Sequence, residues 1–454
     1  MLALYARLLG PLLGGYLLFD KAFAYLRVPG TPLYVGELTL SIGVVGVLAA
    51  TQYLRVVIRE EPIFSVLAAF FLWSLIRFLP GLHQYGIIAV RDFALCYYCL
   101  FAFFAAAALA MSPGILDKWL AQFSRLIPWL LIWLPIGLVL APVLTSAPDV
   151  PFSTVSVLNH KPGNAAIAAL IVLGYLWLFP EQRSARSRAA WSILALGVMA
   201  LSATQNRGGL LGAVMGAAVG LMFYRDRLRL IGRAVVVIGA GLVLALLLPI
   251  QIGTGGQGRT FSASQLIANV ASISGASEAG NLSGTVAGRD QLWTLIYHEQ
   301  ISQGRLIYGS GFGVNLVAQV GDTAVTNDAS DPLRNPHNSH LDVLARTGLV
   351  GFSLWVALWV GWYWRLACGC RRLLQRGWHA RRQTAILCLM AATAILVGSF
   401  FDPQLEGAQM AAMLWTVFGI GVAVTTSRGW FGSRPPEPAP GQSAGPAAGD
   451  EKLA

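Results

Sequence analysis

Long apolar stretches follow one another along most of the chain, and short polar segments separate them. A membrane-spanning helix needs about twenty consecutive, mostly apolar residues. We predict a helical span at each of twelve such stretches. Their approximate bounds are 7–25, 34–51, 63–79, 86–110, 125–145, 163–180, 188–204, 208–224, 230–250, 341–364, 383–401 and 406–426.

Composition supports this interpretation. Hydrophobic residues make up 56% of the 454 positions, charged residues only 12%, and the mean hydropathy is +0.62. Soluble domains carry roughly 25% charged residues. A chain this apolar cannot expose its surface to water, so we predict an all-α polytopic membrane protein rather than a series of soluble domains.

Basic residues indicate the orientation of the spans. The chain has a formal net charge of +11, which in a soluble protein would suggest nucleic-acid binding. Here the charges fall mostly in short loops. With the N-terminus inside, the inner short loops hold seventeen Lys and Arg residues and the outer segments six. This asymmetry follows the positive-inside rule and favours contact with anionic lipid headgroups, with both ends of the chain cytoplasmic.

One connection is far longer than the others. Residues 251–340 follow the ninth span and lie on the outer side in this topology. Loops of that length usually carry function. We expect a glycine-rich start, short helices near Gln265–Ile273 and Asp290–Ile301, and a turn at 309–313. The predicted organisation is therefore spans one to nine in 1–250, the long loop in 251–340, spans ten to twelve in 341–426, and a disordered cytoplasmic tail in 427–454.

Several kinds of chemistry lack their usual motif. The chain has no GxxxxGK[ST] loop for ATP, no HExxH, and no Asp-x-Asp pair in a loop for a metal and a nucleotide-sugar. None of the five cysteines lies in 251–340, and their spacing indicates neither a disulfide framework nor a metal set.

Two outer arginines are candidates for phosphate binding. Arg207 stands between two spans beside a pair of glycines, and a charge at that depth usually has a function or a partner. It could snorkel to the interface or hold a phosphate in a guanidinium fork. Arg289 stands at the expected start of a loop helix, where an anion is favoured. A pair with Asp290 is the alternative there.

Other outer residues could act on a substrate. His337 precedes the tenth span and could accept a proton near neutral pH, or it could be purely structural. His340, three residues later, makes a metal pair conceivable, although no third ligand is spaced with the two. Asp402 could orient a histidine, pair with an arginine, or simply end a helix. Four more cations could add to a positive mouth for a polyanionic lipid: Arg77, Arg91, His160 and Lys161.

The order of these motifs resembles one family. An Asn-Arg-Gly-Gly turn between spans comes first, then Gly-Arg-x-x-x-Trp in the long loop. A glycine-rich turn and Pro-His-Asn-Ser-His-Leu with a following Gly-x-x-Gly complete the pattern. Together they resemble the O-antigen ligase and polymerase superfamily over roughly residues 1–426. The turn holds Asn206 where relatives often carry serine.

The resemblance implies a function and a site. It implies a GT-C-like, metal-independent glycosyltransferase without a cofactor. Such an enzyme moves O-antigen from undecaprenyl diphosphate to lipid A–core oligosaccharide at the periplasmic face of the inner membrane. It implies that His337 is the catalytic base and that Arg207 and Arg289 bind the diphosphate. Asp402 matches a functional acidic position, and Asn338 belongs to the most specific motif. With His160 and Lys161 these residues form the expected substrate site.

Three alternatives remain at this stage. An O-antigen polymerase would use the same donor with a second lipid-linked glycan as acceptor, and a protein-glycosylating oligosaccharyltransferase would use a protein. A lipid-linked glycan transporter belongs to a different class, but paired repeats or broken helices, which are typical of transporters, are not visible in the sequence. We expect membrane lipids and the two glycolipids as partners, no nucleic acid, and a monomer.

Overall fold

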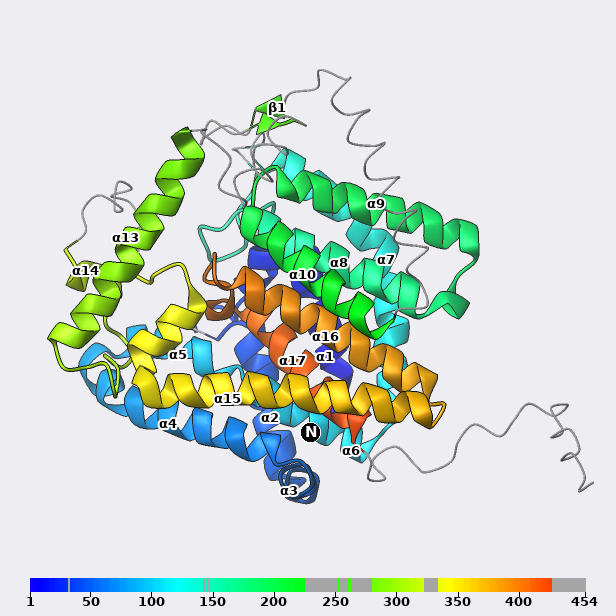
Figure 1. Cartoon of the computed structure of the whole chain (residues 1–454), viewed down its shortest axis with the longest axis horizontal. Helices are drawn as coiled ribbons and strands as arrows, with labels where there is room; N and C mark the ends of the chain where they lie inside the picture. The colour runs from blue at the N-terminus through cyan, green and yellow to red at the C-terminus, as the bar shows by residue number, and fades with distance from the viewer. Residues whose placement is uncertain are drawn as a thin grey trace, which may run out of the picture.

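The computed structural model describes residues 1–31, 33–141, 144, 147–224, 252–253, 260–262, 280–321 and 334–426. Nearly all of this part is helical (Figure 1). Its helices are α1 Leu2–Ala24, α2 Val35–Leu48, α3 Thr51–Glu60, α4 Ile63–Tyr85, α5 Ile87–Tyr97, α6 Leu100–Met111, α7 Ile115–Leu140, α8 Pro162–Leu178, η1 Pro180–Gln182, α9 Ala185–Ala203, α10 Arg207–Phe223, α13 Gly280–Ser302, α14 Leu316–Gln319, α15 Ser339–Gln375, α16 His379–Gly398, η3 Gln404–Glu406 and α17 Ala408–Thr425. Two-residue strands, β1 Ile252–Gly253 and β2 Thr260–Phe261, pair antiparallel.

Eleven of the twelve predicted spans coincide with helices, and the twelfth, near 230–250, lies outside the described residues. Six described helices are long and apolar enough to cross a membrane, and two bent pairs bring the number to eight. The helices α8 and α10 are apolar but shorter. A multi-pass helical membrane protein is therefore confirmed, whereas twelve spans and a GT-C-like fold stay predictions.

The two bent pairs correct the sequence interpretation in detail. The second predicted span, 34–51, covers α2, after which α3 turns away at 89°, and the fourth, 86–110, is α5 followed by α6 at 47°. The helix α3 carries Arg55 and Arg59 among apolar residues. A helix of this composition is suited to lie along a membrane surface rather than to cross it. The apolar run 34–51 thus ends near the start of α3.

The helix α17 forms the centre of the bundle. In its most apolar stretch 94% of the residues are buried, against 33% for α4 and α7, which lie at the periphery. Aromatic rings from α15 surround it: Trp355 and Trp359 pack against Trp415, and Trp362 stacks on Phe418. These large apolar contacts hold α15 against the core.

Small residues let α8, α10 and α16 approach closely. Gly212, Gly216 and Gly220 recur every four residues on α10 and face Ala394 and Met390 of α16. A Cβ added at Gly212 would come 2.5 Å from the Ala394 carbonyl oxygen, so no side chain fits there. Spacing of this kind allows close backbone contact between membrane helices, where van der Waals packing drives association.

A break at Gly348 divides α15. Gly348 has φ +68°, and a Cβ there would come 2.2 Å from the Ile307 carbonyl oxygen. The long loop takes over the interrupted helical bonds, because Ser310 and Gly311 donate to the carbonyls of Ala345 and Arg346. The first turns of α15, 339–347, are therefore bonded to the loop at this break, and the helix covers the whole of the predicted tenth span at 341–364.

The long loop contains a longer helix than expected. The predicted helix Asp290–Ile301 is confirmed, but α13 begins ten residues earlier, at Gly280. It stands beside the bundle at the end where α15 begins (Figure 1). The glycine turn is confirmed too, since Gly309, Gly311 and Gly313 all have positive φ. The predictions for Gln265–Ile273 and for the tail 427–454 lie outside the described residues.

Candidate functional site

The segment 335–338 holds His337 in an unusual backbone conformation. His337 has φ 51°, in the left-handed region that residues other than glycine seldom adopt. The side chain of Asn335 accepts a hydrogen bond from the His337 N–H at 3.3 Å. The indole N–H of Trp293, on α13, donates to the Pro336 carbonyl at 2.7 Å. The peptide group between Pro336 and His337 is thus held at both its C=O and its N–H, which supports the strained conformation of His337.

Asn338 has a structural role in this segment. Its Oδ1 accepts from the backbone N–H groups of His340 and Leu341, at 3.0 and 3.1 Å, and so caps α15. The side chain is buried. Its expected contact with substrate stays a prediction, and the structure explains the residue by the cap.

His340 is unsuited to share a metal with His337. Its Nε2 lies 2.9 Å from the Leu396 carbonyl oxygen, which can only accept, so Nε2 carries the proton. Nδ1 then accepts from the indole of Trp355 at 3.1 Å. Both ring nitrogens are therefore occupied in a buried site. Within the described ranges no three His, Cys, Asp or Glu side chains form a metal-binding group.

Three charged side chains from separate parts of the chain shift the pKa of His337. Burial lowers its pKa most, Asp402 opposes that effect, and Arg289 and Lys161 lower the pKa further. The net pKa lies below the ordinary value, so the imidazole is neutral at pH 7 and can accept a proton. The tertiary structure thus brings together four of the predicted site residues.

Lys161 and Asp402 form an ion pair, with 3.4 Å between Nζ and Oδ1. Burial lowers the pKa of Lys161, but Asp402 and Asp20 outweigh it, so the pKa lies above its ordinary value and the amine stays charged. The pair joins the segment before α8 to the connection between α16 and η3. Asp402 therefore has a specific cationic partner, Lys161, and is more than a residue that ends a helix.

Asp20 is a site residue that the sequence analysis missed. It is buried near the end of α1 with φ 45°, which interrupts the helix. Its carboxylate accepts from the backbone N–H of Lys161 at 2.7 Å and from the Asn164 side chain at 2.8 Å. His160 is its further electrostatic neighbour. An acidic residue inside the apolar run 7–25 was the available signal.

Three helix N-termini gather at the same place. A Cβ at Gly209 would come 2.4 Å from the Gly163 Cα, so the starts of α10 and α8 touch. A Cβ added at Gly208 would come 2.6 Å from the Cβ of Phe401, the residue before Asp402. Arg207 is the first residue of α10, and Asn206 caps that helix. The α15 start joins them through a bond from the Ser339 N–H to the carbonyl of Ser399, at 2.9 Å.

This convergence favours anions. Helix N-termini present unpaired N–H groups and a partial positive charge. Here they lie beside the cations Arg207, Lys161 and Arg289. A phosphate group is the ligand that such an arrangement suits best.

A buried network ties the loop to the bundle. Arg346 pairs with Asp342 at 2.9 Å and with Asp92 at 3.0 Å. Asp92 also accepts from the Gly313 N–H at 3.0 Å and lies 3.6 Å from Arg334. Buried ion pairs are seldom chosen for stability alone, but they fix geometry well. No motif in the sequence indicated this pairing across α5, α15 and the loop.

Glu406 links this region to His337. The Asn335 side chain donates a hydrogen bond to its carboxylate, and the same Asn335 accepts from the His337 backbone. Burial raises the pKa of Glu406 well above its ordinary value, and the carboxylate of Asp342 adds to the effect. Glu406 is thus a candidate positioning residue for His337.

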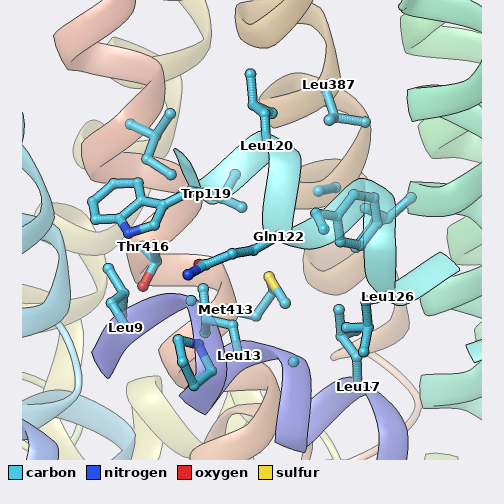
Figure 2. A pocket seen from close by; sticks show the side chains of 18 of the residues that line it. Leu9, Leu13, Leu17, Trp119, Leu120, Gln122, Leu126, Leu387, Met413 and Thr416 are labelled. Atoms are coloured by element: carbon cyan, nitrogen blue, oxygen red, sulfur yellow. The ribbon is translucent and has the colours of Figure 1, made fainter. Parts of the chain in front are cut away.

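An apolar cavity of about 480 Å³ lies between α1, α7, α16 and α17, and Ile171 of α8 completes its lining. Leucines line it from several sides, and Met413 and Gln122 project into it (Figure 2). Its lining includes Leu17 and Leu18, which stand just before Asp20 in α1. One end of the cavity thus lies next to the polar site, and this combination suits a ligand with both an apolar and a charged part.

Comparison with known protein families gives a match that runs from α9 through the long loop into α15. Residues 192–356 match the family model described as O-antigen ligase. The matched segment contains Arg207, Arg289 and His337. A search of curated proteins found no match.

Proposed function

We propose that the chain is a glycosyltransferase that transfers O-antigen from undecaprenyl diphosphate to lipid A–core oligosaccharide, and the match of residues 192–356 to the O-antigen ligase family model supports this proposal. The reaction takes place at the periplasmic face of the bacterial inner membrane. It inverts the anomeric centre and uses no metal ion.

One observation carries this proposal: a neutral histidine, held in a fixed backbone conformation, lies among Arg289, Lys161 and Asp402. The start of α10, with Arg207, touches the same connection that carries Asp402. A base beside a cationic phosphate site is the pair of functions that transfer from a diphosphate donor requires.

The chemical step is a single displacement. The acceptor hydroxyl oxygen attacks the anomeric carbon, while the bond from that carbon to the diphosphate oxygen breaks. The hydroxyl proton moves to His337, and the bonding electrons leave with undecaprenyl diphosphate. Arg207 and Arg289 stabilise the charge that grows on the phosphate oxygens. Asp402 stabilises the imidazolium. One base suffices, in contrast to the two carboxylates of retaining glycosidases.

The lipid part of the donor needs an apolar site. The cavity between α1, α7, α16 and α17 is lined almost wholly by apolar side chains, and its end at Leu17 lies close to Asp20 and Lys161. We assign part of the polyprenyl chain to this cavity, with the diphosphate at the helix N-termini. Burying a chain there contributes about 0.8 kcal/mol per methylene-sized group.

The test uses purified protein in detergent with a synthetic undecaprenyl diphosphate glycan. His337→Ala is expected to lower the rate at least a hundredfold, because a general base contributes about 10²–10⁴-fold. His298→Ala, at an exposed histidine of α13, is the matched control. A chelator is expected to leave the rate unchanged. Full activity of the His337 variant would remove the base assignment.

The acceptor decides between the alternatives. Lipid A–core, a second lipid-linked glycan and an acceptor protein are supplied in parallel. We expect product only with lipid A–core. Product with the second glycan would identify a polymerase, and product with the protein would identify an oligosaccharyltransferase. Movement of the donor across a vesicle membrane without any new glycosidic bond would identify a transporter.

A further inference from the structure

The ion pair between Lys161 and Asp402 is long and partly exposed. Its 3.4 Å separation is longer than the roughly 2.7–2.9 Å of a strong charge-assisted hydrogen bond. The Lys161 side chain is 31% exposed, so an incoming anion can reach the amine. The backbone of Lys161 is held separately, by the bond from its N–H to Asp20. The side chain can therefore change partner without moving the segment that carries it.

We propose that Lys161 pairs with Asp402 when the donor is absent and with the donor's diphosphate when it is present, so that Asp402 then faces His337 alone. The inference rests on the proposed function, in which a diphosphate occupies the α8 and α10 N-termini. It assigns Lys161 as a positioning residue that couples donor binding to the state of the base.

The charges around His337 determine the direction of the effect. Asp402 comes from the connection after α16, Arg289 from α13 and Lys161 from the segment before α8. Lys161 also faces Asp20 and Glu406. Without donor, two cations disfavour a proton on the imidazole and Asp402 is shared. A bound diphosphate neutralises the cations and releases the carboxylate, and both changes favour proton uptake.

The consequence is a base that becomes stronger when the donor arrives. A base works best when its pKa approaches the working pH. Before donor binding, the lowered pKa of His337 leaves it a weak base. After binding, the same imidazole takes the acceptor proton more readily. Binding of the diphosphate leaving group thus strengthens His337, the base that promotes its departure.

Two pH profiles test the exchange. At saturating acceptor, the acidic limb of kcat/KM for the donor reports His337 without donor, and that of kcat reports the complex. We expect the midpoint of the kcat limb to lie about one pH unit higher than that of the kcat/KM limb, because a change in one close charge shifts a pKa by about that much. In Lys161→Met, the midpoint pH of the kcat/KM limb should rise more than that of the kcat limb, because Asp402 is already free without donor. The gap between the two midpoints therefore narrows. The donor KM rises about tenfold.

Matched variants separate exchange from other effects. Lys161→Arg keeps the charge and should keep the gap, and Lys118→Met, at an exposed lysine of α7, should leave both limbs unchanged. Asp402→Asn should also narrow the gap, but by moving both limbs to lower pH. Equal shifts of both limbs in Lys161→Met would overturn the exchange, because they would mean that Lys161 acts on His337 identically in both states.

A measurement without turnover separates this inference from the proposed function. The protein is labelled with ¹³C-histidine, and His337→Gln assigns the His337 signal. Inorganic pyrophosphate is expected to raise the pKa of His337 in the wild type and by less in Lys161→Met. No rise in the wild type would overturn the exchange even if the enzyme proves to be a ligase. A rise in a protein whose His337→Ala variant is fully active would instead leave the exchange standing and remove the base role.

Discussion

At the residue scale, the position of His337 depends on side chains that take no part in the chemistry. Its left-handed backbone costs on the order of 1–3 kcal/mol. Asn335 and Trp293 hold the N–H and the C=O of the peptide group before His337, and Asn335 is itself held by Glu406. The strain is therefore carried by contacts from α13 and from the connection before α17. In the proposed reaction, a base fixed in this way needs little reorganisation when the acceptor binds.

The Glu406 contact leads to a prediction. Burial raises the pKa of Glu406, which favours its protonated form. Glutamine is close to that form in shape. We expect Glu406→Gln to keep nearly full activity and Glu406→Ala to lower kcat about tenfold at an unchanged donor KM, which about 1.4 kcal/mol of misplacement would produce. Steady-state kinetics with both substrates measures this.

Glu181→Ala, at an exposed position of η1, is the control for a lost carboxylate. A change in donor KM alone would contradict the positioning role, because it would place Glu406 in donor binding. Equal loss in the Gln and Ala variants would show that the charge, rather than the hydrogen bond to Asn335, matters.

At the element scale, the site is made by helix ends. The helices α8, α10 and α15 all begin beside the connection that carries Asp402. Their close approach requires glycine, because Gly163 and Gly209 meet backbone to backbone. The glycine stripe along α10 then keeps this helix against α16. The geometry of the anion site thus follows from how closely two helices can pack.

Gly209→Ala tests this packing. Its Cβ would stand 2.4 Å from the Gly163 Cα, and backbone atoms cannot move aside as a flexible side chain can. We expect a loss of about 1–3 kcal/mol in stability, the usual cost of overpacking. The donor KM should rise as well, because Arg207 moves with the α10 start. Thermal unfolding and donor titration measure the two effects.

Gly197→Ala is the matched control. Gly197 lies in α9, and a Cβ added there would meet no heavy atom of another element within 4 Å. Alanine there should be neutral or stabilising by about 0.5–1 kcal/mol, because glycine is a weak helix former. If both variants behaved alike, the contact between the α8 and α10 starts would have no special role.

At the scale of the whole molecule, the apolar cavity and the polar site lie end to end. Side chains from α1, α7, α8, α16 and α17 line the cavity, and α1 connects the two regions because Leu17 and Leu18 precede Asp20. The buried Arg346 network joins the long loop to α5 and α15. The apolar cavity and the charged site thus match the amphipathic donor that we propose.

Filling the cavity should affect long-chain donors selectively. Ala391 lines the cavity and is buried. We expect Ala391→Phe to raise the KM for the undecaprenyl donor at least tenfold, which corresponds to about 1.4 kcal/mol of lost burial. A donor with a short prenyl chain should keep its KM. An equal change for the two donors would exclude the cavity as the chain site.

The sequence by itself determined the features that depend on local pattern. Hydropathy over about twenty residues located the helices, and short motifs identified Arg207, Arg289 and His337 as candidates. Local spacing also predicted the helix within the long loop and the glycine turn. These features follow from neighbouring residues, so a single sequence contains them.

Only the tertiary structure decided which polar side chains meet. Lys161 pairs with Asp402, Asn335 with Glu406 and Arg346 with Asp92, and each pair joins distant parts of the chain. Hydropathy does not encode such partners, because they depend on how closely the helices pack and on where each one ends. The same holds for Asp20, whose role appears only when the start of α8 reaches its carboxylate. Packing between helices therefore turns separate motifs into one site.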